Sequence, residues 1–405
     1  MPEVAPTARA VPHSRIREIA EVAMRMDAES RTPSERVLRL FFGESNLPTP
    51  AFIQEAAHRA MLDGYTVYSE NAGIPSLRRA IALNYEQLHG ISLDPTREIV
   101  VTNSGVQALN VGIRCTLDPG DEAIVITPAW PNQVSNVRMC NATPREVPLA
   151  LQRGRYVVDF EALEAVVNRR TRLLIYTSPS NPSGWVATLD EQQRLLEFAR
   201  RHALWLLADE VYERLWYPAS LPAGSPSPSI LKLATRADAV MVVQSFSKSY
   251  CMTGWRLGWL VARADLAERA TQLNEFIISC APGFVQKAAE IALSDGEASL
   301  LEMLVLYKAN RDYCVDVFRR MPGVTLPSPD GAFYVFPRID GLTDSFSFCE
   351  RLLLETRVGL APGVAFGAGG EGSIRLCYAV KTEMLAEALA RIGTFVERSV
   401  STTAT

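Results

Sequence analysis

The 405-residue chain lacks the features of secreted, membrane-spanning and nucleic-acid-binding proteins. Its seven cysteines are odd in number and no two share a CxxC spacing, so we expect no disulfide framework and no zinc site, and a reducing cytoplasmic location fits best. No apolar run approaches the roughly 18 residues of a membrane span, and we expect no signal segment. With 41 Lys and Arg against 45 Asp and Glu, no nucleic-acid partner is expected.

Metal and dinucleotide motifs are also missing or incomplete. The 4 histidines lie far apart in the sequence and none has a metal-ligand spacing, so no metal site is expected. The segment 367–372 satisfies the pattern G-x-G-x-x-G. A dinucleotide fingerprint needs a strand before it and a helix after it, whereas a strand-like run at 373–380 follows here. The motif therefore does not predict a nicotinamide or flavin site.

What the chain does contain is typical of a globular protein of two or three domains, with 48% apolar and 21% charged residues. Short, continuous apolar runs are expected to form strands buried on both faces; they lie at 98–102, 123–127, 173–177, 204–208 and 239–244. Helical stretches at 107–115 and 189–202 alternate with them. This pattern predicts an α/β fold with a mostly parallel sheet flanked by helices.

The pattern changes after about residue 262. A long helical region is expected at 265–321, followed by short strands at 332–336 and 373–379 and by helices at 345–355 and 382–397. Short strands mixed with helices indicate a smaller α+β domain after the large one.

Polar residues follow four of the predicted strands directly, in the runs Thr102-Asn103-Ser104-Gly105, Ser178-Pro179-Ser180-Asn181, Asp209-Glu210 and Ser245-Phe246-Ser247-Lys248. Ligands of α/β sheets bind at the carboxyl ends of the strands. If these strands are neighbours, one pocket holds Asn181, Asp209, Tyr212, Lys248 and Arg256. That combination of a lysine, a carboxylate, a hydroxyl and a guanidinium is unusual.

Each of these residues also has a plain structural interpretation. Lys248 could lie on a solvated turn, or it could be a Schiff-base lysine whose pKa is lowered by burial. Asp209 could be a surface charge, or it could keep the ring nitrogen of a pyridine cofactor protonated. Ser104-Gly105-Val106 could be a helix cap, or it could present N–H groups to an anion, and Arg256 could bind a phosphate.

Three ordered runs resemble a known family: Ser245 to Gly258 (SFSKSYCMTGWRLG), Asn181 to Gly184 (NPSG) and Ala208 to Tyr212 (ADEVY). The chain resembles the class I/II aminotransferases, which are pyridoxal-phosphate (PLP) enzymes of fold type I, from about Gly43 to Arg375. The resemblance implies an arm at 1–48, a large cofactor domain at 49–295 and a small domain at 296–405.

The resemblance also implies a role for each matching residue. Lys248 would hold the cofactor covalently and act as the general base, Asp209 would pair with the ring nitrogen, and Asn181 and Tyr212 would bind the ring oxygen. The ring would stack on Trp130. The phosphate would be bound by Ser104, Gly105, Val106, Ser245, Ser247 and Arg256, with Tyr68 contributed by the neighbouring subunit of a homodimer.

Substrate recognition is less completely implied. Arg375 matches the arginine that binds the substrate α-carboxylate, with Gly43 and Asn181 beside it, so α-amino acids and 2-oxo acids are the expected substrates. No arginine stands out as a second clamp for a dicarboxylate. Phe41, Phe42 and Trp216 hint at an apolar or aromatic side chain.

Two alternatives to transamination stay open. The same residues could serve another PLP reaction, such as that of a β-lyase, a decarboxylase, a synthase or an amine oxidase, because the fold does not decide the reaction type. A non-catalytic PLP sensor would need a DNA-binding or partner module, and no basic segment is left over for one.

Overall fold

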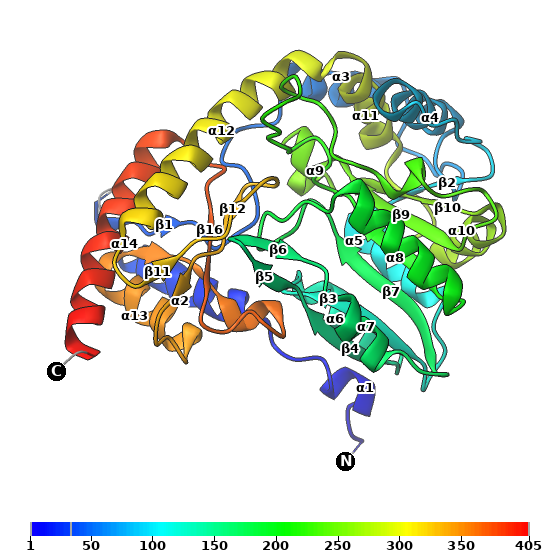
Figure 1. Ribbon diagram of the computed structural model, residues 1–405. Helices are drawn as coiled ribbons and strands as arrows, with labels where there is room; N and C mark the ends of the chain where they lie inside the picture. The colour runs from blue at the N-terminus through cyan, green and yellow to red at the C-terminus, as the bar shows by residue number, and fades with distance from the viewer. Residues whose placement is uncertain (1, 33–34, 404–405) are drawn as a thin grey trace.

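The computed structural model describes residues 2–32 and 35–403, with side chains up to residue 398. Its centre is a seven-stranded sheet in the order β2-β10-β9-β8-β7-β3-β4 (Figure 1). These strands are β2 (Ile99–Thr102), β3 (Glu122–Thr127), β4 (Thr143–Pro148), β7 (Thr171–Thr177), β8 (Trp205–Asp209), β9 (Val240–Ser245) and β10 (Gly258–Ala262). All neighbours are parallel except β10, which is antiparallel to both β2 and β9. The predicted α/β fold with a mostly parallel sheet is confirmed.

Helices cover both faces of this sheet, and the strand residues alternate between the two covers. Leu174, Leu206 and Val242 pack with the helices α3 (Ala51–Leu62), α4 (Pro75–His89), α7 (Phe160–Val166), α8 (Leu189–Arg201) and α11 (Gly283–Asp295). Leu173, Leu207 and Val243 pack with α5 (Gly105–Arg114), α6 (Pro131–Met139) and α10 (Ala264–Ile277). Burial on both faces explains why these strands read as continuous apolar runs rather than as alternating ones.

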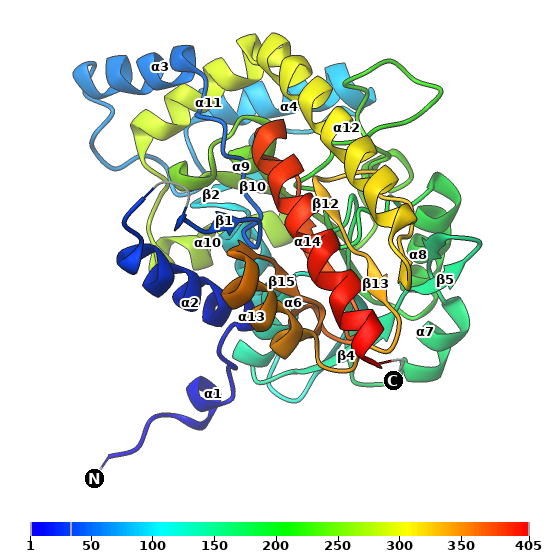
Figure 2. The same cartoon turned by 90° about the vertical axis from the view of Figure 1, so that its left-hand side faces the viewer.

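A third core joins the two ends of the chain. Buried residues between Ile16 and Phe41 pack with residues between Leu300 and Val396. The helices here are α2 (Arg15–Glu29), α12 (Glu297–Arg320), α13 (Ser345–Thr356) and α14 (Thr382–Thr403). Figure 2 shows α14 beside α12, and α2 beside α13. The short strands are β1 (Leu38–Arg39), β12 (Tyr334–Val335), β14 (Val358–Gly359), β15 (Ala361–Pro362) and β16 (Ile374–Cys377).

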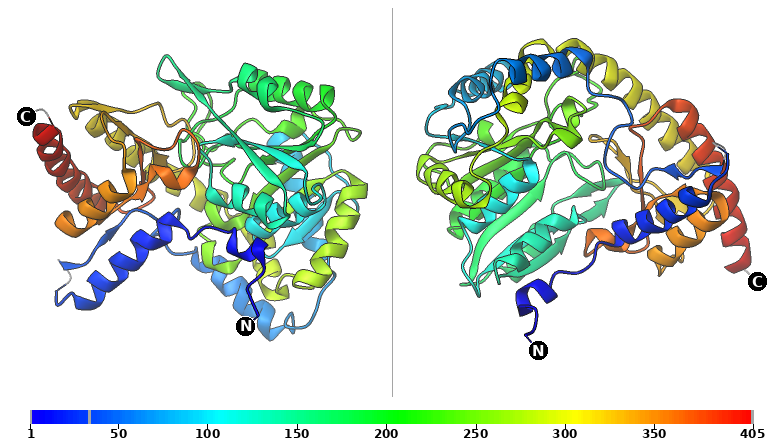
Figure 3. Two further views of the ribbon diagram at one scale, coloured as in Figure 1. Left: turned by 90° about the horizontal axis from the view of Figure 1, so that it is seen from below. Right: turned by 180° about the vertical axis from the view of Figure 1, so that it is seen from behind.

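The parallel pair β1–β14 fixes the N-terminal segment to this C-terminal unit. Viewed from below, α2 lies with α13 and α14 at one end of the molecule, away from the large sheet (Figure 3). The remaining elements are α1 (Pro6–Arg9), β5 (Ala150–Gln152), β6 (Arg155–Val157), α9 (Phe246–Ser249), β11 (Val324–Thr325) and β13 (Arg338–Ile339). Within the described residues, no helix is long and apolar enough to cross a membrane.

Some expected elements differ from the structure. The single helical region expected at 265–321 is three helices, because the segment 278–282 turns the chain and α11 meets α12 at Gly296. The strands β4 and β10 were not predicted. The glycine-rich segment 367–372 leads into β16 and not into a helix, as the sequence indicated.

Candidate active site

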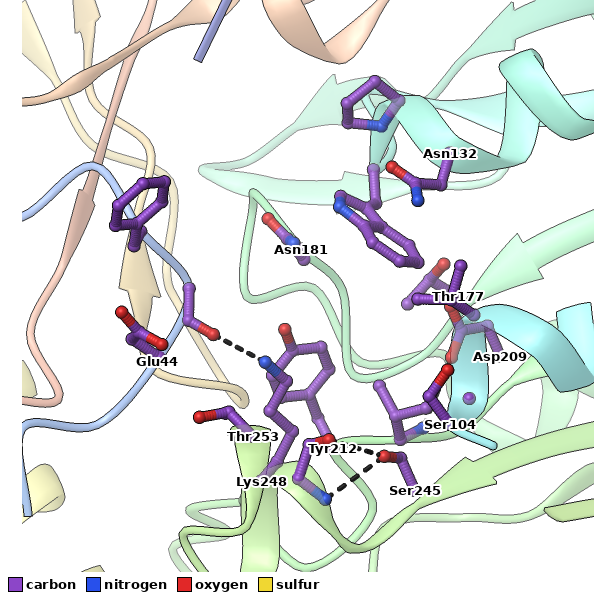
Figure 4. Close-up of a pocket in the computed structure, with 18 of the residues that line it drawn as sticks. Glu44, Ser104, Asn132, Thr177, Asn181, Asp209, Tyr212, Ser245, Lys248 and Thr253 are labelled. Carbon is purple, nitrogen blue, oxygen red and sulfur yellow. Dashed lines mark hydrogen bonds between the residues drawn. The ribbon is translucent and has the colours of Figure 1, made fainter. Parts of the chain in front are cut away.

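The carboxyl ends of β7, β8 and β9 open onto one cavity of about 550 Å³, which the start of α5 also borders. Figure 4 shows side chains that point into this cavity from the large sheet, such as Asp209 and Lys248, and from the N-terminal segment, such as Glu44. Thirteen of the fourteen predicted site residues line the cavity: Gly43, Ser104, Gly105, Val106, Trp130, Asn181, Asp209, Tyr212, Ser245, Ser247, Lys248, Arg256 and Arg375. The convergence expected from the sequence is therefore present.

Lys248 lies on α9, the single turn that follows β9. Its Nζ donates a hydrogen bond to the carbonyl oxygen of Gly43 at 2.5 Å (Figure 4). The same Nζ lies 5.6 Å from the ring centres of Tyr212 and Phe333. Burial lowers the pKa of Lys248 to about 8, since desolvation disfavours the ammonium form. A fraction of this amine is therefore neutral, and nucleophilic, near physiological pH.

Asp209 is the last residue of β8, and only 4% of it is exposed. The backbone N–H of Val211 donates to its Oδ1 at 3.4 Å, and Gln133 Nε2 lies 3.5 Å from its Oδ2. Burial raises the pKa of Asp209 to about 6. Among the described residues it has no ion-pair partner. A buried carboxylate without a cation is costly, so this position favours a ligand that brings a positive N–H.

The turn after β8 is stabilised by contacts on the side that faces away from the cavity. Glu210 Oε1 accepts a hydrogen bond from the backbone N–H of Ile230 at 2.9 Å, and Glu213 lies 3.1 Å from His89 Nε2 at the end of α4. Burial raises the pKa of Glu210 to about 8. Because these contacts lie behind the cavity wall, they fix the turn that presents Asp209 and Tyr212 to the cavity.

Two tyrosine hydroxyls and an amide line the same cavity as Lys248. The Tyr212 and Tyr334 hydroxyls are 2.7 Å apart, and Asn181 Oδ1 accepts from Arg375 Nη1 at 2.8 Å. Burial raises the pKa of Tyr212, so its hydroxyl stays protonated and can donate. Gly43 is required here, because a Cβ at this position would lie 2.2 Å from the Tyr334 hydroxyl.

The opposite end of the cavity is suited to an anion. Ser104 caps α5, and the first N–H groups of this helix, at Gly105 and Val106, have no partner within it. Ser245 Oγ donates to Ser247 Oγ at 2.9 Å. The guanidinium of Arg256 also lines this end. Hydroxyls, helical N–H groups and a guanidinium together form a typical phosphate site.

This anion site requires close contact between strand β10 and the start of helix α5. A Cβ at Gly258, on β10, would lie 2.5 Å from the backbone nitrogen of Gly105. Ser104 has φ +112° and Arg256 has φ +55°, both unusual for residues with side chains. Strained backbone of this kind persists where the surrounding structure fixes it.

Arg375, on β16, is 2% exposed. Its two terminal nitrogens donate to neutral oxygens, those of Asn181 and of the Phe41 carbonyl, and its Nε has no partner. Its guanidinium lies 4.6 Å from the centre of the Tyr334 ring and 4.9 Å from that of Phe366. No carboxylate of the described residues pairs with this guanidinium, so its charge is available to a bound anion.

Tyr68 is the one predicted site residue outside the cavity. It lies on the loop after α3 and is 87% exposed. Phe41, Phe42 and Trp216 were expected to line the pocket for the substrate side chain. Phe41 and Phe42 do line the cavity, but the expectation for Trp216 was wrong, because Trp216 lines a separate cavity at the start of α8.

Several residues of the site were not predicted from the sequence. In the first turn of α6, Asn132 lines the cavity, and the buried Gln133 lies next to it and 3.5 Å from Asp209 Oδ2. The neighbouring run Pro128-Ala129-Trp130-Pro131 was a usable signal for both, since it places a helix start beside Trp130. Arg17, on α2, also lines the cavity. No local motif marked it, because the fold brings it there from a distant segment.

Comparison with known proteins agrees with this geometry. The family described as aminotransferase class I and II matches residues 39–392. An aspartate aminotransferase of Pyrococcus horikoshii is 34% identical over 387 residues, covering 94% of each chain. The aromatic-amino-acid aminotransferase 2 of Thermococcus litoralis is 34% identical, covering 88% of this chain and 91% of its own.

Solved structures give the same result. The aspartate aminotransferase of Thermotoga maritima superposes with a TM-score of 0.88 at 31% identity, covering 97% of this chain and 100% of its own. The aromatic aminotransferase of Pyrococcus horikoshii superposes with a TM-score of 0.85 at 33% identity, covering 95% and 99%. The chain therefore belongs to the class I and II aminotransferases.

Proposed function

We propose that this aminotransferase uses pyridoxal phosphate, bound in the 550 Å³ cavity, to move an amino group from an α-amino acid to a 2-oxo acid by a ping-pong mechanism. The observation that carries the proposal is that a buried lysine and a buried aspartate, which has no ion-pair partner among the described residues, lie on the walls of one cavity. When bound, the cofactor supplies an aldehyde that captures amino groups and a ring that accepts electrons.

The residues present fit this cofactor. Asp209 would hold the ring nitrogen protonated, which would also relieve its own burial as a lone charge. Tyr212 and Asn181 would donate to the ring oxygen, and Trp130 would cover the ring face. The phosphate would be held at the anion end of the cavity by Ser104, Gly105, Val106, Ser245, Ser247 and Arg256.

Lys248 would carry the cofactor covalently and, once released by the substrate amine, move the proton at the substrate Cα. Its lowered pKa of about 8 suits a base near neutral pH. Gly43 would restrain it, since the carbonyl oxygen of Gly43 accepts from Nζ.

Arg375 would bind the substrate α-carboxylate with Asn181 and Gly43 beside it. A guanidinium already held by Asn181 and Phe41 needs little ordering to meet a carboxylate. Binding there would leave the substrate Cα within the cavity that Lys248 faces.

Product analysis tests the reaction type. The holoenzyme is mixed with a panel of α-amino acids without an acceptor, and its products are identified. We expect a 2-oxo acid and pyridoxamine phosphate in equal amounts. Release of ammonia, sulfide or CO₂ as the main product would assign the chain to another PLP reaction.

We also propose a homodimer with shared active sites. Tyr68 and Val67 are exposed apolar side chains on the loop after α3, and Leu62, Phe276 and Ile277 are exposed apolar side chains at the ends of α3 and α10. The loop that carries Tyr68 packs on the end of α10 and on the segment after it, because Asn274 donates to the Asn71 carbonyl and Ser69 N–H donates to Cys280 Sγ. A second copy covering these side chains would bury them and bring Tyr68 to the partner's phosphate site.

Subunit complementation tests the shared site. A Tyr68→Phe protein and a Lys248→Ala protein are mixed under conditions that exchange subunits. In a hybrid dimer one site collects both changes and the other collects neither. We expect activity above that of both parents. Verified hybrids without any recovery would place Tyr68 in the site of its own chain.

Two further points belong to this proposal. The division into an arm at 1–48, a large domain at 49–295 and a small domain at 296–405 is supported by the third core, which joins residues before Phe41 to residues after Leu300. A cytoplasmic location is supported by the free thiols of all seven cysteines, as expected in a reducing compartment.

A further inference from the structure

The loop between Lys248 and Arg256 is held at two points by one hydroxyl group from a distant segment. Thr49 Oγ1 donates a hydrogen bond to the carbonyl oxygen of Cys251 at 2.6 Å and accepts one from the indole Nε1 of Trp255 at 3.0 Å. Thr49 itself is not among the residues that line the cavity. Its hydroxyl therefore acts on the loop from outside, at a residue directly beside Arg256.

The hydroxyl of Thr49 serves this loop and not the helix that follows it. Threonine near the start of a helix commonly caps the free N–H groups of the first turn. The N-cap of α3 is Pro50, however, and no side chain caps its first turn. Both the O–H donor and an acceptor lone pair of Thr49 are instead used by the loop.

The loop contains strained backbone at the two places that Thr49 holds. Cys251 has φ +53°, and Arg256, which follows Trp255, has φ +55°. Residues with side chains rarely adopt this left-handed conformation, and they keep it only where the surrounding structure fixes it. The two hydrogen bonds of Thr49 supply such a constraint at Cys251 and next to Arg256.

Within the loop, the guanidinium of Arg256 is bound to the backbone. Its Nη1 donates to the carbonyl oxygen of Thr253 at 2.6 Å, and the backbone N–H of Trp255 donates to that of Met252 at 3.2 Å. Met252 is buried in a core of the large sheet, and Trp255 packs against the same core. The direction of the Arg256 side chain thus depends on the conformation of this short turn.

The segment that carries Thr49 is itself fixed. The Tyr307 hydroxyl donates to Ser45 Oγ at 2.5 Å, and the backbone N–H of Asn46 donates to the carbonyl oxygen of Ala379 at 3.1 Å. Tyr307 and Ala379 both belong to the core that joins the two ends of the chain. Thr49 is therefore a fixed point against which the loop is held.

We infer that Thr49 is a positioning residue, which acts through residues 251–255 to hold the guanidinium of Arg256 against the phosphate of the cofactor. This inference rests on the proposed function, because it needs the cofactor phosphate at Arg256. Loss of the hydroxyl leaves the Cys251 carbonyl and the Trp255 indole N–H without this partner, so the loop can leave its left-handed conformations. The phosphate contact should weaken, whereas the contacts of the ring and of Lys248 should remain.

The test compares Thr49→Val, which keeps the shape of the side chain and loses the hydroxyl, with Thr49→Ser, which keeps the hydroxyl. Thr271→Val is the matched control, because Thr271 Oγ1 donates to the Ala267 carbonyl within α10 at 2.9 Å and does not line the cavity. Dissociation constants are measured on the full-length apoenzymes for PLP, for pyridoxal, which lacks the phosphate, and for inorganic phosphate. We expect Thr49→Val to raise the constants for PLP and phosphate roughly 5- to 50-fold and that for pyridoxal less than threefold.

Two further variants complete the test. Thr49→Ser and Thr271→Val should bind all three ligands within about twofold of the wild type, since both keep the contacts of the loop. Trp255→Phe removes the indole N–H and keeps a ring. It should weaken PLP and phosphate binding by itself and add little to the effect of Thr49→Val, because both changes break the same hydrogen bond.

The outcomes separate this inference from the proposed reaction. Unchanged PLP binding in Thr49→Val, equal weakening for PLP and pyridoxal, or a loss that Thr49→Ser does not restore would overturn the role of Thr49. If Thr49→Val does not fold, Trp255→Phe carries the same comparison of PLP with pyridoxal. A wild-type enzyme that does not transaminate, with the expected differences in ligand binding intact, would contradict only the proposed reaction.

Discussion

The two ends of the cavity are built differently. The cofactor end is formed by the turns that follow strands of one sheet, and each turn carries its functional residues within a few positions, as in the runs around Asp209 and Lys248. The substrate end is formed by residues from opposite ends of the chain, Arg17 on α2 and Arg375 on β16, joined by one core. Local motifs therefore describe the cofactor end well and the substrate end poorly. Changes at the first should impair the chemistry, whereas changes at the second should impair substrate binding and leave the cofactor bound.

The largest effect is expected for Lys248→Ala. Removing the amine removes both the covalent attachment and the base, so turnover should fall on the order of 10⁵-fold or more for every donor. Turnover is measured with the donor panel, and the visible absorption of the lysine-bound cofactor should disappear while cofactor is still retained. Turnover near that of the wild type would show that Lys248 is not the reactive lysine.

The second largest loss of turnover is expected for Asp209→Asn, and it should apply to all donors. The variant keeps the shape of the side chain and loses the charge that would keep the ring nitrogen protonated, so we expect a loss on the order of 10³-fold in kcat with the cofactor still bound. Glu210→Gln, one residue further on and behind the cavity wall, is the matched control and should keep most activity. Equal losses in both variants would point to a damaged turn rather than to the electrostatic role.

Arg375→Lys should affect binding at the substrate end alone. Lysine cannot reproduce the two parallel hydrogen bonds of a guanidinium, so kcat/KM should fall roughly 30- to several-thousand-fold, about equally for all amino acids. The cofactor dissociation constant should change little, since the phosphate would be bound at the other end. Loss confined to acidic donors would show that Arg375 binds the substrate side chain and not the α-carboxylate.

The smallest effect on activity is expected for Glu210→Gln, behind the cofactor end of the cavity, where the change should appear in the pH dependence of stability. The pKa of Glu210 is raised from 4.5 to about 8, so the folded chain keeps a proton that the unfolded chain releases across this range. Its contribution to stability is full below about pH 4.5 and is lost as the pH rises to about 8. Urea unfolding at pH 5 to 8 should show a shallower fall for Glu210→Gln, by up to about 1.4 kcal/mol per pH unit. Parallel pH profiles for the two proteins would rule out this titration.

Features that depend on local sequence were predicted well, and features that depend on contacts between distant segments were not. Buried strands such as β7 and β8 were located to within a few residues, because burial on both faces leaves continuous apolar runs. The strand β10 was missed because its run follows the loop at Arg256 without a break. The role of Gln133 beside Asp209 and the position of Arg17 depend on contacts between distant segments, which no local pattern records.

The most direct measurement of the central claim is chemical trapping of the holoenzyme. Reduction with borohydride fixes the cofactor to the amine that holds it, and mass spectrometry of the digested protein then locates the label. The account predicts that the label lies on the peptide containing Lys248, and that prior addition of an α-amino acid prevents this labelling. A label on any other lysine, or labelling of Lys248 that an amino donor does not prevent, would contradict it.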